Sequence, residues 1–275
     1  MPSNRKIIPI YTDNPEQEIW NYIANFEIEK FVNNYLDKNR TSNDNINNFD
    51  NNNDNGFDRQ KLIIAITNNA KQAREFFMLS KQLPLSSRPV LLHYAFEKLT
   101  IMLILLKFGY NESIRQHGLI YCDNIEVKKD GLFVKLHEYF YPDTNLKGEE
   151  FDLKVVINAN AISRIKIGYN IVNNSEIKIT TIKNHNIISI KELEREFIFS
   201  FVLSVLARYQ ISKWMEILSG GDGKIILKIR RYFESIQLLF PNLILNELYD
   251  KFLEFYNPAQ FAIFELDNYD ISLDL

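Results

Sequence analysis

The feature that most constrains this chain is a long apolar segment in its first half, Val90 to Phe108. The segment is apolar at nearly every helical turn, and Glu97 and Lys98 are its main charged interruption. A helix that is apolar on most of its faces has to be buried on most of them, so the segment predicts a central helix and not a surface helix. Pro89 suits the first turn of such a helix, where no backbone N–H is needed, and Gly109 can supply a left-handed stop.

The composition fits a cytoplasmic protein with a sizeable core. Hydrophobic residues make up 46% of the 275 residues, which suffices for one large domain or two small ones, and we expect a single domain over residues 1–275. The net charge of −3 predicts no overall attraction to nucleic acid or anionic lipid. The only cysteine is Cys122, which excludes an internal disulfide and a cysteine-built metal site and fits a reducing cytosol. The first residues lack the apolar core of a signal peptide, and Met102 to Phe108 is too short to span a bilayer.

Helical periodicity also marks segments on both sides of the apolar one. We expect further helices over residues 15–36, 59–82, 191–218, 223–240 and 242–256. Asn14 is the expected N-cap of the first of them, and Pro241 separates the last two. Residues 39–58 are rich in Asn and Asp and cannot bury enough apolar surface to order the backbone, so we expect a flexible insertion there.

The period of the pattern changes after about residue 120. Ile125 to Lys128 alternates apolar and polar side chains, and residues 129–131 supply a turn signal. Leu132 to Leu136 then resumes an apolar run. This arrangement predicts a β-hairpin.

Further strand signals follow the expected hairpin. Residues 165–171 and 177–190 look like strands, whereas Phe151 to Ile162 fits a strand or a short helix equally well. We therefore expect a mainly α fold. It is a helical bundle around a buried central helix, residues 88–109, with a small β-hairpin or β insertion at about 120–190.

Four short motifs carry a resemblance to a known family. They are LPLSSRPVLLHYAFEKLTIMLIL from Leu83, HGL from His117, KDGLF from Lys129 and SVLARYQISKW from Ser204. In this order and spacing they resemble the YaaC-like proteins of bacteria, over roughly residues 15–38 and 59–256. The resemblance implies a shared architecture and no established activity, and our leading hypothesis is accordingly a binding or interaction module. His93 departs from the family pattern, which has a tyrosine there, and this puts a family-wide role for His93 in doubt.

The first candidate catalytic pair is Arg88 with His93. An Arg followed after four residues by a His resembles the active motif of HEPN-type ribonucleases, in which the His would act as acid or base and the Arg would hold the phosphate. This second hypothesis, a ribonuclease in a toxin or defence setting, predicts a homodimer with two copies of both residues facing one cleft. It also requires an accessible His93. The alternative is that Arg88 pairs with a carboxylate and that His93 is a core histidine.

A third hypothesis is an enzyme acting on a small anionic or phosphorylated ligand through Arg88, His117 and Arg208. Gly118 lets the backbone turn so that His117 can point into a pocket, although the same residues also fit a helix stop. Arg208 lies late in an apolar helix, where a buried cation needs a partner, and Glu97 is the partner we expect. We predict that Arg88, Glu97 and Arg208 approach one another in the core.

Other candidate binding residues lie in the second half of the chain. Tyr209 and Trp214 are candidates for stacking on a ligand, although such residues more often belong to the core. One late helix has a basic face that is the best local site for RNA or an acidic partner, formed by Lys224, Lys228, Arg230 and Arg231. We expect no metal and no cofactor, because the four histidines show no ligand spacing and the glycines before Lys224 lack the spacing of a P-loop.

Overall fold

The structure is a computed structural model that describes residues 5–40, 59–109, 116–121, 124–128, 130–151, 176–182, 187–219 and 223–256. Eight helices hold 68% of these residues and only small sheets accompany them, which confirms the mainly α prediction. The Asn-rich insertion from residue 41 onward, the strand expected over 165–171 and Cys122 lie outside the described residues. The division of the chain into domains stays a prediction from the sequence.

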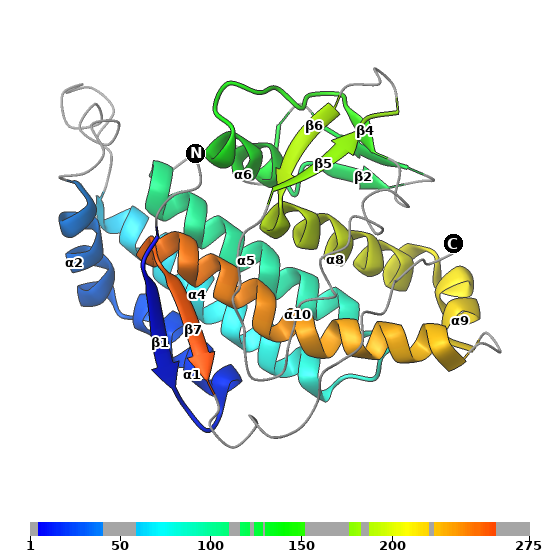
Figure 1. Ribbon diagram of the computed structural model, residues 1–275, viewed down its shortest axis with the longest axis horizontal. Helices are drawn as coiled ribbons and strands as arrows, with labels where there is room; N and C mark the ends of the chain where they lie inside the picture. Colours follow the sequence, from blue (N-terminus) through cyan, green and yellow to red (C-terminus); the bar gives the residue numbers. More distant parts are fainter. Residues whose placement is uncertain are drawn as a thin grey trace.

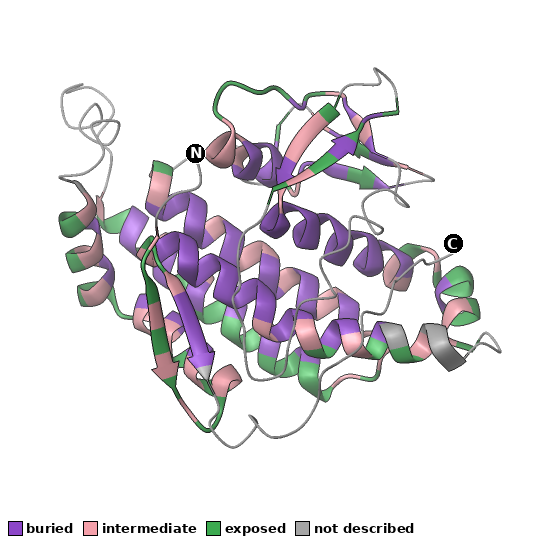
Figure 2. Cartoon of the chain, in the orientation of Figure 1, coloured by how far each residue is buried: buried purple, intermediate pink, exposed green. Residues whose placement is uncertain are grey.

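Helix α5, Arg88–Phe108, is the central helix that the sequence predicts. It packs against α4, Arg59–Gln82, against α8, Glu192–Tyr209, and against α10, Gly223–Tyr249 (Figure 1). Figure 2 shows buried residues along most of its length. They include Leu92, His93, Ala95, Phe96, Leu99, Thr100, Met102, Leu103, Ile104, Leu105 and Leu106. Gly109 ends the helix with a φ of 82°, and its N–H donates to the Leu105 carbonyl at 2.9 Å, as the stop signal predicts.

Among the described residues, α5 is the one helix long and apolar enough to cross a membrane. Of the apolar window that meets this criterion, 67% is buried inside the protein. Neighbouring helices therefore already cover most of the apolar surface that a bilayer would otherwise have to cover, which is the environment of a core helix.

The first expected helix is divided into two. Helix α1, Pro15–Ala24, continues as a short 3-10 turn, and Ile28 then takes an extended conformation before α2, Glu29–Arg40, begins. Asn14 is the predicted N-cap, since its side chain accepts from the Gln17 N–H at 3.1 Å. An apolar pattern that continues at helical spacing across Ile28 hides this break from the sequence.

The third expected helix is also divided. Helix α8 ends at Tyr209, Gln210 adopts a non-helical conformation with φ −121° and ψ 50°, and α9 runs over Ile211–Ser219. The backbone turn at Gln210 re-aims the chain, so that Trp214 of α9 packs back into the core with 1% of its surface exposed.

The expected break at Pro241 is wrong, because α10 runs through this residue to Tyr249. A proline inside a helix loses one backbone hydrogen bond and costs roughly 3 kcal/mol. Its neighbours Phe240, Asn242 and Leu243 are buried, so packing against the rest of the core offsets that cost.

The last described segment is a strand and not the end of the expected helix. Strand β7, Phe252–Tyr256, pairs in parallel with β1, Ile7–Tyr11, near the start of the chain. Asp250 stops α10 with a φ of 51°, and the Asn246 side chain accepts from the Leu253 N–H at 2.8 Å. The two ends of the described chain therefore meet in one sheet (Figure 1).

The β insertion lies over one end of α8 (Figure 1). Its first sheet has the order β2, Leu119–Tyr121, β3, Ile125–Val127, and β4, Glu150–Phe151, all antiparallel. A second antiparallel pair joins β5, Glu176–Thr180, to β6, Ile187–Lys191, close to the strand region expected at 177–190.

The second strand of the predicted hairpin is wrong, because residues Leu132–Phe140 form helix α6. The apolar run is short enough to fit either period, and the tertiary structure decides between them. The N–H groups of Leu132 and Phe133, at the helix start, donate to the carbonyls of Gln116 at 2.7 Å and His117 at 3.0 Å. The start of α6 thereby fixes the backbone that carries His117.

Candidate functional site

His93 lies inside the interface between α5 and α8. Its side chain is 1% exposed, its Nδ1 lies 3.0 Å from the Ser200 hydroxyl, and its ring contacts Phe197 and Phe201. The Ser200 hydroxyl donates to the Phe197 carbonyl at 2.9 Å, so it accepts the proton of Nδ1. Among the described residues, Nε2 has no hydrogen-bond partner. Burial, together with the nearby His117 and Arg208, lowers the pKa of His93 to about 3, so the imidazole is neutral at physiological pH.

The position of His93 argues against the ribonuclease hypothesis. A general acid or base has to reach the substrate, and this ring is enclosed by the core. Arg88 does not turn toward it, because the Arg88 Nε and Nη2 donate to the Leu83 carbonyl at 3.3 and 3.1 Å. In this chain His93 packs α5 against α8. Arg88 closes the turn that precedes the helix.

His117 lies at the surface end of the same interface. Its ring stacks obliquely on Phe201 at 4.6 Å between centroids, and its Nδ1 accepts from the Leu119 N–H at 3.2 Å. In the neutral form Nε2 therefore carries the proton. Gly118 makes the predicted turn with a φ of 81°, and a Cβ there would lie 3.1 Å from the Gly131 Cα. Burial lowers the pKa of His117, and the positive charges of Lys128 and Arg208 lower it further.

Arg208 reaches this region from the last turn of α8. Its Nη1 donates to the Tyr94 hydroxyl at 2.8 Å, and its Nε and Nη2 donate to the carbonyl and hydroxyl of Ser204 at 3.2 and 3.1 Å. The guanidinium also lies over the rings of Tyr94 and Tyr209, at 5.5 and 5.0 Å from their centroids. Tyr209 is 73% exposed, so the end of the cluster formed by His93, His117 and Arg208 that lies at Arg208 faces solvent. All the described partners of Arg208 are electrically neutral.

The structure does not contain the predicted ion pair of Arg208 with Glu97. The charge of Arg208 acts on Glu97, because it opposes the rise that burial causes in the pKa of this carboxyl. No hydrogen bond or ion pair joins the two in the described part of the chain. Arg88 meets neither residue in the described contacts, since it lies nine residues before Glu97, about 13.5 Å along α5 and on its opposite face.

The remaining predicted binding residues fall in different places. Trp214 is buried, and its Nε1 donates to the Ser86 carbonyl at 2.9 Å, which makes it an anchor of α9 on the start of α5. Arg230 is exposed and Arg231 half-buried on α10, whereas the side chains of Lys224 and Lys228 lie outside the described ones. The basic face of α10 therefore stays a prediction.

Sequence reasoning missed Lys128, Tyr94 and Ser204. The Lys128 N–H donates to the Gly118 carbonyl at 2.9 Å, which places this residue beside the turn of His117, and its positive charge lowers the pKa of His117. Tyr94 and Ser204 hold the guanidinium of Arg208. The tyrosine precedes Arg208 by 114 residues, and no local pattern links residues at that separation.

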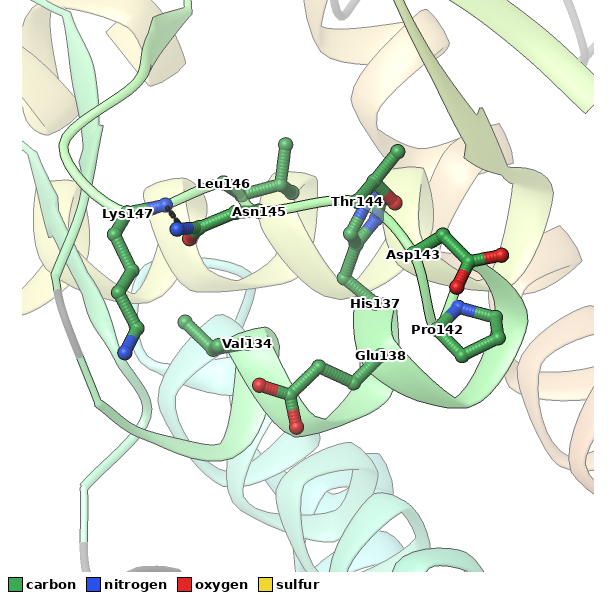
Figure 3. Close-up of a pocket in the computed structure, with 9 residues that line it drawn as sticks. All are labelled: Val134, His137, Glu138, Pro142, Asp143, Thr144, Asn145, Leu146 and Lys147. Carbon is green, nitrogen blue, oxygen red and sulfur yellow. Dashed lines mark hydrogen bonds between the residues drawn. The ribbon is translucent and has the colours of Figure 1, made fainter.

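A pocket of about 270 Å³ lies elsewhere, between α6 and the loop that follows it (Figure 3). Its lining consists of Val134, His137, Glu138, Pro142, Asp143, Thr144, Asn145, Leu146 and Lys147. His137 bridges two residues, because its Nδ1 lies 2.7 Å from Glu194 Oε1 and its Nε2 lies 3.0 Å from Thr144 Oγ1. In the sequence, His137 stands out only as one of four scattered histidines. No group of three potential metal-binding side chains occurs among the residues described.

A comparison with protein-family models identifies one family. The model of the YaaC-like protein family matches residues 24–161 and 160–248, which contain α5, both histidines of the cluster and Arg208. No curated protein and no solved structure matches the chain. The matched segments cover most of the 275 residues, in agreement with the resemblance of the central helix and of the HGL motif. The chain therefore belongs to the YaaC-like protein family.

Proposed function

We propose that this YaaC-like protein is a binding module for a small anionic ligand, such as one that carries a phosphate group. The site is formed by His117, Lys128 and Arg208. The observation that carries the proposal is the gathering of positive charge around His117, where two cations lower the pKa of an imidazole that stacks on Phe201. Repulsion of this kind is relieved when an anion binds.

The geometry of Arg208 supports an anion at this position. A guanidinium has five N–H groups, and the described hydrogen bonds of Arg208 use three of them. Two N–H groups remain for a ligand, and a planar guanidinium binds phosphate or carboxylate through such paired donors. Tyr94 and Ser204 hold the side chain in place, so less of its conformational freedom is lost on binding.

The burial of His93 supports binding rather than catalysis at this site. Its imidazole supplies no accessible acid or base, although its neutral state keeps a third positive charge out of the interface. A cytoplasmic location, predicted from the single cysteine, is part of the same proposal and suits a ligand of the metabolic pool.

Isothermal titration calorimetry with pyrophosphate tests the proposal. The wild-type protein should bind with uptake of a proton near pH 6, because a bound anion raises the pKa of His117. The proton appears as a difference in heat between buffers of different ionisation enthalpy. The variants Arg208→Gln and Lys128→Gln should each bind about tenfold or more weakly, since each loses a charge-assisted contact.

The matched control is Lys71→Gln, which removes one exposed positive charge from α4 and should leave the affinity unchanged. Circular dichroism checks that each variant is folded. Wild-type protein that gives no binding heat with pyrophosphate, or variants that all bind equally well, would contradict the site.

A further inference from the structure

The pocket beside α6 contains three side chains in the order hydroxyl, imidazole, carboxylate. Thr144 Oγ1 lies 3.0 Å from His137 Nε2, and His137 Nδ1 lies 2.7 Å from Glu194 Oε1. In Figure 3 the Thr144 side chain lies over the His137 ring. A base hydrogen-bonded to a hydroxyl, and itself oriented by a third group, is the arrangement that activates a nucleophile.

The carboxylate is rigidly held. Glu194 is in the first turn of α8, and its Oε2 accepts from the Lys191 N–H at 2.6 Å in a capping box. Glu194 and His137 are 0% and 1% exposed, so the surrounding core fixes the orientation of both side chains. Burial raises the pKa of Glu194, and the hydrogen bonds from His137 and from the Lys191 N–H oppose this rise. When Glu194 is ionised, its carboxylate accepts the proton of His137 Nδ1, which leaves Nε2 free to accept.

The hydroxyl is at the accessible end of the arrangement. Thr144 is exposed in the loop after α6 and lines the pocket together with His137. Its single proton has two acceptors, His137 Nε2 at 3.0 Å and the Tyr141 carbonyl at 2.8 Å. The hydroxyl donates to the Tyr141 carbonyl in the resting arrangement, and its rotation exchanges that bond for one to Nε2, which gives the reactive state.

We propose that Thr144 is the nucleophile of an esterase-type site, with His137 as its general base and Glu194 as the positioning residue. The substrate is a small ester with a short acyl group, because the pocket has a volume of about 270 Å³ and a partly apolar lining that includes Val134 and Leu146. The amide of Asn145 and the ammonium of Lys147 line the same pocket, and such groups stabilise a developing negative charge.

Water is the only reactant that the reaction needs besides the ester. Thr144 Oγ forms a bond to the ester carbonyl carbon, and its proton passes to His137 Nε2. The bond from that carbon to the alkoxy oxygen breaks, and the leaving alcohol takes the proton from Nε2. A water molecule then attacks the acyl-threonine and gives one proton to Nε2. The released Thr144 oxygen takes this proton back, so the products are an acid and an alcohol.

Incubation with p-nitrophenyl acetate tests this proposal independently of anion binding. The wild-type protein should release p-nitrophenolate and gain one acetyl group, which peptide mass spectrometry should locate on Thr144. Thr144→Val keeps the shape of the side chain and should reduce acetylation of this peptide to background, while Thr144→Ser should retain it. His137→Gln should slow the reaction by about 100-fold or more, the contribution of a general base.

Glu194→Gln separates positioning from mere support of the fold. The neutral amide no longer fixes the orientation of the imidazole, so kcat for p-nitrophenyl acetate should fall while KM stays unchanged. Circular dichroism and the pyrophosphate titration check that every variant is folded. Acetyl groups found only on lysines, or an equal rate in wild type and Thr144→Val, would overturn the proposal.

Discussion

Replacement of His93 by phenylalanine should make the free energy of unfolding less sensitive to acid. His93 is neutral in the folded protein because burial lowers its pKa to about 3, whereas its pKa in the unfolded chain is the ordinary 6.5. The unfolded chain therefore binds a proton that the folded protein does not. This contribution is fully present above pH 6.5 and is lost as the pH falls toward 3.

The size of the effect follows from these two pKa values. Linkage between protonation and folding gives a loss of about 2 kcal/mol in the free energy of unfolding between pH 7 and pH 5. Phenylalanine has a similar shape and no titrating group. The Ser200 hydroxyl keeps its bond to the Phe197 carbonyl in the variant, and no buried polar atom is left unpaired by the change. At pH 7 the two proteins should therefore differ by less than about 1.5 kcal/mol.

Urea unfolding at pH 7 and pH 5 measures the difference. Trp20 and Trp214 are buried, so their fluorescence reports the transition. The wild type should lose about 2 kcal/mol more than His93→Phe over this range. Ser200→Ala is the control, because it removes the partner of the imidazole and keeps the titrating group, and it should retain the pH dependence. An equal loss in wild type and His93→Phe would refute the neutral, buried imidazole.

Two further predictions concern the scaffold. Gly131→Ala should lower the thermal midpoint far more than Gly148→Ala, because both glycines have positive φ but only at Gly131 would a Cβ collide with backbone; equal shifts would contradict this contact. Glu247→Gln should cost about 3 kcal/mol in urea unfolding, because it breaks the paired hydrogen bonds from Arg5 at 2.7 and 2.8 Å to a carboxylate that is buried. Glu27→Gln, in a more exposed ion pair, should cost less than about 1 kcal/mol, and a similar cost for both would argue against burial as the cause.

The local features of the fold were open to prediction from residue patterns. A segment that is apolar around its whole circumference has no stable place except the core, and α5 occupies that place. Asn14 and Gly109 end or begin helices as expected, since a cap depends on a side chain or a backbone angle within a few residues. The mainly α class and the small sheets follow from the same local signals.

The errors in the fold all involve contacts between distant segments. α6 replaces a predicted strand because its first N–H groups meet the carbonyls beside His117. α10 continues through Pro241 because the core on both sides of it is buried. β7 forms because β1, almost the whole chain away, offers a parallel edge. Helix breaks and short apolar runs are decided by such partners rather than by propensity.

The candidate sites divide in the same way. The sequence by itself determined that His117 and Arg208 are candidates for an anion site and that Gly118 turns the backbone between His117 and Leu119. Only the tertiary structure decided that Lys128 joins them, that Arg88 does not, and that His137 meets a carboxylate 57 residues away. Spacing along the chain carries information about neighbours within a turn or two of helix. Side chains from different elements meet only where the packed core brings those elements together, and that packing involves the whole chain at once.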